Sequence, residues 1–223
     1  KSVIVCSAND SSVALAEHIS GSEASFVEMM NSRARDMQLD NTNYVNCTGL
    51  PADNQYSCAI DVAKVLKNVL EYEKYHEYSS IWLEDFQHPS GRTTEMTNTN
   101  RLSRFYEGCI GGKTGSTNEA GYCLAVGAKR GDLSLIAVVL GANSTKDRFK
   151  SASDLLNYGF ASYENHIIDV ESLVNISCKN GRMVDVRIEG CNTILAKKGE
   201  APEYETRCYL PNTISSCNVG QAF

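Results

Sequence analysis

The eight residues Leu133–Leu140 constrain the fold more than any other stretch, because all but Ser134 are apolar. Such a run is typical of a β-strand covered on both faces. Residues 122–129 are predicted to be a second strand, and the turn at residues 130–132 joins the two into an antiparallel hairpin. Ile110–Thr114 is predicted to be a shorter strand leading in. The sequence therefore predicts a central antiparallel sheet, with residues 113–115 at its edge.

Helical patterns occupy most of the sequence before this sheet and return after it. Apolar residues spaced by three or four, next to capping serines or a closing glycine, predict amphipathic helices. The predicted helices are Ser11–Ile19, Ser22–Met37, Ser57–Tyr72 and one opened by Ser144. Residues 38–56 are rich in turn-forming residues and predict an irregular loop, whereas Ile81–Leu83 and Glu95–Asn98 predict a small hairpin.

The pattern changes after Tyr163 to short alternating stretches separated by Asn-Gly, Glu-Gly and Lys-Gly turns. This spacing is typical of a small all-β unit. The predicted strands are Leu173–Cys178, Met183–Ile188, Thr193–Ala196 and Glu203–Tyr209. The fold class is therefore α+β. An antiparallel sheet with a helical subdomain is expected in residues 1–163, followed by an incomplete all-β unit in residues 164–223.

Composition excludes several classes of function. The formal net charge is −6 and no Lys/Arg cluster stands out, so a nucleic-acid partner is not expected. The longest apolar runs fall far short of a membrane span. The nine cysteines form no Cys-x-x-Cys pair, so we predict no metal site and no cofactor. Two states remain open for them: a disulfide such as Cys178–Cys191, or small buried apolar side chains.

Two short motifs carry the chemistry, and each has an ordinary structural explanation. Ser7-x-Asn9 could simply cap the first helix. Lys113-Thr114-Gly115 could be a solvated strand end. Their contexts favour function, because the first motif directly precedes a helix and the second lies on a strand that opens the hairpin. Ser-x-Asn-type and Lys-Thr-Gly motifs occur together in penicillin-binding proteins and serine β-lactamases.

With their flanks, these motifs resemble the serine D-alanyl-D-alanine carboxypeptidases of peptidase family S11. Ser7–Ile19 resembles the second motif of the family together with its helix. Residues 98–100, 111–117 and 120–123 resemble the third motif with both flanks. The loop at residues 46–50 resembles the family's Asn-Pro-His-Gly-Leu, with Cys and Thr in place of Pro and His. The resemblance implies a β-lactamase/transpeptidase-like sheet and, from residue 164, the start of a β-sandwich domain.

One departure from the family pattern is prominent. The family's nucleophilic serine and its lysine form Ser-x-x-Lys upstream of the Ser-x-Asn motif. Only six residues precede Ser7, and none of them begins such a pair. We therefore expect residues 1–163 to be an N-terminally truncated peptidase domain that is inactive alone, or that is completed by a separate polypeptide.

The resemblance implies an acyl-enzyme mechanism in which terminal D-Ala is released from a D-Ala-D-Ala peptide. Lys113 and Thr114 would hold the terminal carboxylate of the substrate. Gly115 would let the substrate run alongside the strand as an added strand.

The remaining roles are also carried over from the family. The N–H of Ser116 would stabilise the oxyanion. Ser7 would relay a proton to the leaving amine, and Asn9 would bond an amide carbonyl of the substrate. The implied partners are peptidoglycan stem peptides and β-lactams. The implied location is the bacterial cell envelope, outside the cytoplasm, with any membrane anchor lying outside this chain.

The sequence leaves two other functions open, a serine β-lactamase relative and a non-catalytic peptidoglycan-binding module. The upstream sequence and β-lactam hydrolysis would separate them. In the family that the chain resembles, the strand matching Leu133–Leu140 is central, and the strands beside it come from an N-terminal segment that this chain lacks. The apolar run would then have an unpaired edge, which invites pairing with another chain. We therefore predict self-association through these residues, or a rearrangement that covers them.

Overall fold

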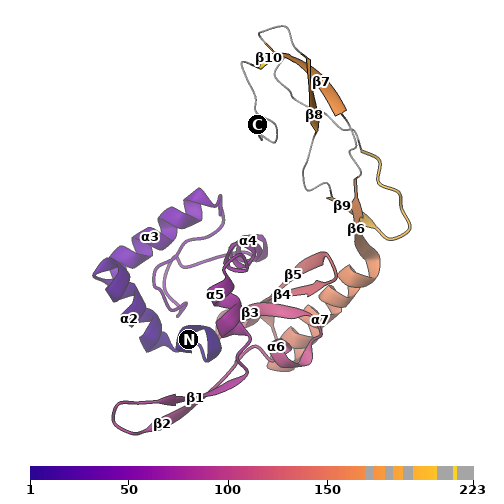
Figure 1. Ribbon diagram of the computed structural model, residues 1–223. Coiled ribbons are helices and arrows are strands. Elements are labelled where there is room, and N and C mark those ends of the chain that lie inside the picture. The colour runs from indigo at the N-terminus through magenta and orange to yellow at the C-terminus, as the bar shows by residue number, and fades with distance from the viewer. Residues whose placement is uncertain (169–172, 179–182, 188–192, 205–212, 215–223) are drawn as a thin grey trace. The chain divides into compact units, whose positions relative to one another are not determined.

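The structure, a computed structural model, describes residues 1–168, 173–178, 183–187, 193–204 and 213–214. The chain divides into two compact units, Lys1–Ala161 and Ser162–Phe223. Helices and antiparallel sheets share the first unit, and the regular elements described in the second are strands, apart from the last residue of a helix (Figure 1). The predicted α+β class is confirmed.

Seven helices are described in the first unit, and local sequence explains several of their ends. They are α1 (Ser2–Val5), α2 (Asn9–Ser20), α3 (Glu23–Asp36), α4 (Ala59–Val69), α5 (Glu73–Ser79), α6 (Leu102–Phe105) and α7 (Thr145–Ser162). Gly21 ends α2 in the left-handed conformation. The Ser22 hydroxyl caps α3 by accepting from the Ser25 N–H. None of the helices in the described ranges has both the length and the apolarity that crossing a bilayer requires.

The sheet that carries the candidate site consists of β3 (Cys109–Thr117), β4 (Gly121–Arg130) and β5 (Leu133–Ala142). These strands lie in the order β3-β4-β5, and both pairs are antiparallel. Lys113 pairs with Ala125, and Gly115 pairs with Cys123. The predicted hairpin is confirmed, but β3 is longer than the expected Ile110–Thr114.

The prediction that Leu133–Leu140 is covered on both faces is met only in part, because Leu133 and Ala137 are buried whereas Ser134 and Leu140 are exposed. The strand covered on both faces is β4, in which residues 124–128 are all buried. Strand β5 has an outer position in the described sheet, and the Leu140 side chain is 44% exposed. Strand β4 has a neighbouring strand on each edge, whereas β5 has one on a single edge of the described sheet, although α4 and α7 both reach β5.

Helices cover the two faces of the sheet at glycine contacts. On one face, a Cβ at Gly127 would lie 2.6 Å from Cδ1 of Leu70, the residue that caps α4. On the other face, a Cβ at Gly159 of α7 would lie 2.5 Å from Cδ1 of Leu135. A side chain at either position would displace a leucine methyl group, so glycine lets helix and sheet approach closely there.

A small hairpin, β1 (Leu83–Gln87) with β2 (Thr93–Thr97), leads into the segment before α6. Both strands lie partly outside the predicted ranges. Ile81 lies before β1, and its carbonyl oxygen accepts from the Asn98 side chain at 2.8 Å. Asn98 also donates to the Ser79 carbonyl at 3.1 Å. One buried amide therefore ties the end of β2 to the end of α5.

The second unit contains β6 (Tyr163–Ile167), β7 (Leu173–Cys178), β8 (Met183–Arg187), β9 (Thr193–Lys197) and β10 (Thr213–Ile214). Strand β6 pairs with β9, and β7 lies between β8 and β10. Three of the four predicted strands are present as β7, β8 and β9, while β6 was not predicted. Residues 205–209 of the fourth predicted strand lie outside the described residues, as does Cys191 of the suggested disulfide.

Gly112 offers a direct test of how tightly β3 is packed. A Cβ at this position would lie 2.4 Å from the Ala125 carbonyl oxygen and 2.9 Å from Cα of Val126, both backbone atoms that cannot turn away. Gly112→Ala is therefore expected to lower the free energy of unfolding by about 1–3 kcal/mol or more.

Gly115→Ala is the matched control, because nothing lies within 4 Å of its ideal Cβ. Its effect should stay within about 0.5 kcal/mol. Urea unfolding followed by circular dichroism measures both variants. Equal stability of the two would contradict the described packing of β3 on β4.

Candidate active site

The side chains of Ser7 and Lys113 meet at the outer edge of β3. The Lys113 ammonium donates to Ser7 Oγ and also to the Thr114 carbonyl oxygen, the latter at 2.9 Å. Ser7 lies between α1 and α2 and adopts the left-handed conformation, with φ of 58°. Residues other than glycine rarely adopt this conformation, and when they do the strain is often found at functional sites. The fold therefore joins the two predicted motifs, which are far apart in sequence.

The electrostatic state of Lys113 is perturbed. Its pKa lies below the ordinary lysine value, first because burial disfavours the charged form and second because the Arg148 guanidinium is close. The nearby Cys6 thiol has a smaller, opposite effect. A cation that is partly desolvated beside another cation favours the arrival of an anion.

Two hydrogen bonds through Thr99 link Thr114 to α1. Its hydroxyl donates to Thr99 Oγ1 at 2.8 Å, and the Thr99 N–H donates to the Val5 carbonyl at 3.0 Å. The flanking residues Asn98 and Asn100 are almost fully buried, and Asn100 N–H donates to Asn98 Oδ1. The side-chain oxygens of both asparagines accept backbone N–H groups, so these residues organise the backbone beside the site.

The other predicted site residues are more exposed. Asn9 is the first residue of α2 and is exposed. Within the described residues, its side chain makes no hydrogen bond to Ser7 or Lys113. Gly115 and Ser116 are exposed near the end of β3, and the space beside Gly115 is open. The structure thus brings Ser7, Lys113 and Thr114 together, and leaves an accessible edge after them.

Sequence reasoning missed Arg148, in the first turns of α7. Its side chain is buried, and Nη1 donates to the carbonyls of Gly115 at 3.1 Å and Cys123 at 3.3 Å. The rings of Tyr122 and Phe149 lie 5.7 and 4.9 Å from its guanidinium carbon. Its Nε is buried without a partner among the described residues. An arginine near a helix start looks like a solvated side chain in sequence, so no local signal distinguished it.

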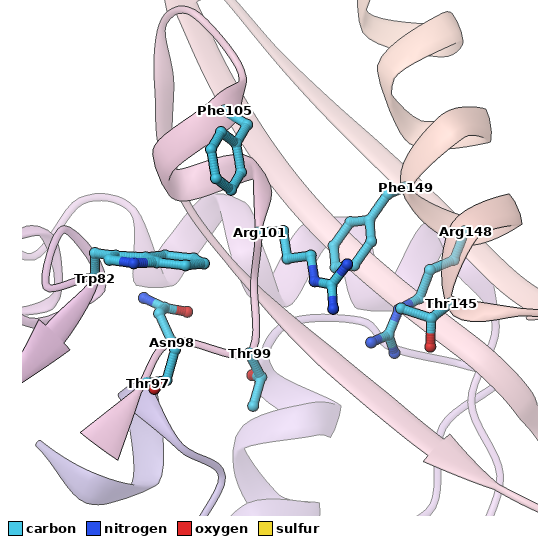
Figure 2. A pocket seen from close by; sticks show the side chains of 9 residues that line it. All are labelled: Trp82, Thr97, Asn98, Thr99, Arg101, Phe105, Thr145, Arg148 and Phe149. Carbon is cyan, nitrogen blue, oxygen red and sulfur yellow. The ribbon is translucent and has the colours of Figure 1, made fainter. Parts of the chain in front are cut away.

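A pocket of about 500 Å³ opens beside Arg148, and Figure 2 shows the side chains that line it. Three are aromatic, two are arginines and none is acidic. The lining residues are Trp82, Thr97, Asn98, Thr99, Arg101, Phe105, Thr145, Arg148 and Phe149. Thr99 and Arg148 both contact β3 at residues 114 and 115, so the pocket borders the Lys-Thr-Gly segment. Its charge suits an anionic group with a small apolar body.

The cysteines and acidic residues in the described ranges do not assemble a metal site. No group of three or more His, Cys, Asp or Glu side chains there could hold an ion. Cys6, Cys47, Cys58, Cys109 and Cys123 are free thiols. Burial is the largest of the effects that raise the pKa of Cys47 to about 11, and the nearby Glu23 adds to it. Cys47 therefore stays a neutral thiol at physiological pH.

Comparison with known proteins agrees with the motifs. A family model described as Peptidase_S11, D-alanyl-D-alanine carboxypeptidase, matches residues 1–144. The chain is 38% identical over 204 residues to the D-alanyl-D-alanine carboxypeptidase DacF of Bacillus subtilis, covering 90% of this chain and 52% of that protein. It is 38% identical over 165 residues to DacC of Escherichia coli, covering 74% and 40% respectively. The chain thus spans about half the length of these relatives or less.

Solved structures agree as well. The D-alanyl-D-alanine carboxypeptidase DacD from Francisella tularensis matches with a TM-score of 0.75 and 26% identity, covering 88% of this chain and 61% of that one. Penicillin-binding protein 5 from Haemophilus influenzae matches with a TM-score of 0.75 and 33% identity, covering 88% and 58% respectively. The expected transpeptidase-like fold is confirmed.

Proposed function

The chain belongs to the peptidase S11 family of D-alanyl-D-alanine carboxypeptidases, and from this premise we propose that the protein containing it removes the terminal D-alanine from peptidoglycan stem peptides. The observation that carries the proposal is the contact between Lys113 and Ser7 beside an accessible strand edge. That contact unites the two motifs of the family in one place. The reaction is acyl transfer to a serine followed by hydrolysis.

The nucleophile in this proposal lies outside these 223 residues, because no Ser-x-x-Lys sequence occurs among them. The serine oxygen would attack the carbonyl carbon of the penultimate D-alanine. The amide bond would then break, and the leaving amine would take a proton as D-alanine departs. Water would hydrolyse the resulting ester and regenerate the serine. Residues 1–163 would supply the rest of a peptidase domain, and residues 164–223 the start of a β-sandwich domain.

The terminal carboxylate of the substrate would bind where positive charge gathers. Lys113 and Thr114 border this point, and Arg148 adds a buried guanidinium at the wall of the pocket. A planar guanidinium matches the two oxygens of a carboxylate, so Arg148 extends the set of anchors beyond those visible in sequence. The pocket beside it would receive the small apolar side chain.

The remaining groups would act on the scissile amide. Gly115, with open space beside it, would let the peptide pair with the edge of β3. The N–H of Ser116 would donate to the developing oxyanion. Ser7, held by Lys113, would pass the proton to the leaving amine. Asn9, at the start of α2, would bond an amide carbonyl of the substrate.

Location follows from the substrate in this proposal. Peptidoglycan is assembled outside the cytoplasm, so we place the protein in the bacterial cell envelope.

Penicillin tests the assignment of the nucleophile. The 223-residue chain alone should form no covalent adduct with benzylpenicillin, whereas the full-length protein should gain one drug mass on a serine of a Ser-x-x-Lys pair. Intact-protein mass spectrometry followed by peptide mapping measures both. A stable adduct on any serine of the isolated chain would refute the assignment.

The full-length protein in the same experiment separates the alternatives. Rapid turnover of a chromogenic β-lactam without accumulation of an adduct would favour a β-lactamase. Binding of peptidoglycan without acylation or hydrolysis would favour a non-catalytic module.

Lys113 is expected to increase the rate of acylation. Lys113→Ala in the full-length protein should slow acylation by about one to two decades or more, because a charge-assisted contact contributes roughly 1.5–3 kcal/mol. The matched control is Lys129→Ala, an exposed lysine on β4. Stopped-flow acylation kinetics measure both variants, with thermal unfolding to show that folding is intact. An acylation rate of Lys113→Ala within about twofold of the wild-type rate would show that Lys113 is an ordinary surface lysine.

The outer position of β5 supports a proposal about association. An apolar strand with an unpaired edge pairs readily with another chain, so we propose that the isolated 223-residue chain self-associates through Leu133–Leu140. Light scattering should show species larger than a monomer, with protection of these amides that depends on concentration in hydrogen exchange. A monomer whose Leu135–Val139 amides exchange slowly at every concentration would show that the edge is satisfied within the chain.

A further inference from the structure

Two neighbouring side chains of α5 bond to the backbone of β3 just before the candidate site. The Tyr75 hydroxyl accepts from the Gly112 N–H at 3.0 Å and lies 3.2 Å from the Gly112 carbonyl oxygen, to which it donates. The ring of His76 bridges two carbonyls, with Nδ1 at 3.0 Å from the Ile110 oxygen and Nε2 at 2.7 Å from the Leu70 oxygen. Side chains thus replace a neighbouring strand along this part of β3.

The direction of these bonds shows which groups remain for a ligand. Backbone groups of successive strand residues point alternately toward one edge and the other. The N–H and C=O of Gly112 point at Tyr75, away from β4. The backbone N–H and C=O of Thr114 and Ser116 therefore also point to the outer edge of β3. The Thr114 carbonyl already accepts from the Lys113 ammonium. Helix α5 therefore covers the outer edge of β3 as far as Gly112. The part of this edge that is proposed to pair with substrate begins directly after Gly112.

The contact is tight and chemically suited to hold the strand. A Cβ at Gly111 would lie 2.8 Å from Cε1 of Tyr75 and 3.0 Å from Oγ of Ser79. Gly111 therefore lets the backbone of β3 approach α5 closely, and Gly112 lets it approach β4. Burial raises the pKa of the Tyr75 phenol, which keeps it protonated and able to donate. The Tyr75 hydroxyl bonds to both the N–H and the C=O of Gly112. No neighbouring strand in the described sheet offers these two groups a partner.

We propose that Tyr75 is a positioning residue of the site: its hydroxyl holds both backbone groups of Gly112 and thereby fixes where Lys113 and the free edge of β3 stand against the substrate. The proposal rests on the proposed function and names a residue outside the family motifs. Tyr75 acts through Gly112 and Lys113 and does not touch the substrate. A displacement of Lys113 by a fraction of an ångström would weaken its contacts with Ser7 and the substrate together.

The test is Tyr75→Phe in the full-length protein, which keeps the ring and removes only the hydroxyl. The value of kcat/KM for a diacetyl-Lys-D-Ala-D-Ala peptide should fall about tenfold. The alkaline limb of the pH profile should move to higher pH, because a loosened Lys113 becomes better hydrated and loses proximity to Arg148, the two causes of its lowered pKa. Tyr72→Phe, an exposed tyrosine just before α5, is the matched control and should stay within twofold.

A purely structural role predicts a different result. If Tyr75→Phe only unfolded a fraction of the molecules, kcat would drop equally at every pH and the profile would keep its shape. A double-mutant cycle adds a second criterion. In the Lys113→Ala background, Tyr75→Phe should have little further effect, since its action passes through Lys113. The proposal would be overturned if the effects of the two substitutions on kcat/KM multiplied and the pH profile of Tyr75→Phe stayed unshifted. It would also be overturned if kcat/KM of Tyr75→Phe lay within twofold of wild type.

A readout independent of activity keeps the two hypotheses apart. The lysines are labelled by reductive ¹³C-methylation, and the Lys113 signal is assigned with the Lys113→Ala variant and titrated by NMR. Its pKa should rise in Tyr75→Phe and stay unchanged in Tyr72→Phe. If the wild-type protein hydrolyses no D-Ala-D-Ala peptide, the proposed function fails, yet this titration still decides whether Tyr75 positions Lys113. An unchanged titration would overturn the positioning role.

Discussion

The close approach of two cations, the half-buried Lys113 and the buried Arg148, is the constraint around which the site is built. Removing charges from water is costly unless they are paired or hydrogen-bonded. The structure meets part of that cost with neutral groups: Ser7 and the Thr114 carbonyl for Lys113, and two strand carbonyls for Arg148. The remainder appears as the lowered pKa of Lys113. A site left positive in this way is prepared for an anion, which agrees with a carboxylate at the end of the proposed substrate.

Holding such a site requires a rigid frame, and the frame is made mostly of side-chain contacts to backbone. Asn98 ties the end of β2 to α5, and Tyr75 ties α5 to β3. Arg148 ties α7 to β3 and β4. These contacts link separate elements of the first unit, and those of Tyr75 and Arg148 reach β3 on either side of Lys113. The position of Lys113 is therefore set by several helices and not by its own strand alone.

Much of this could be predicted from residue patterns. The hairpin of β4 and β5 followed from apolar periodicity with a glycine turn, and α2 and α3 from helical spacing and caps. The motifs at Ser7 and Lys113 carried enough chemistry to predict that they act together. Periodicity could not tell which strand is central, because Leu133–Leu140 is more continuously apolar than β4 although β4 is the better covered. Burial depends on neighbours in space, which a single strand does not encode.

The sequence by itself determined the class of fold, the sheet hairpin and the chemical identity of the residues at the centre of the site. Only the tertiary structure decided that Ser7 touches Lys113, and that Arg148 and Tyr75 belong beside them. The physical reason is the range of the interactions. Turns, caps and periodicity act within a few residues of the chain, whereas desolvation and side-chain contacts to distant backbone exist only after the helices have packed on the sheet.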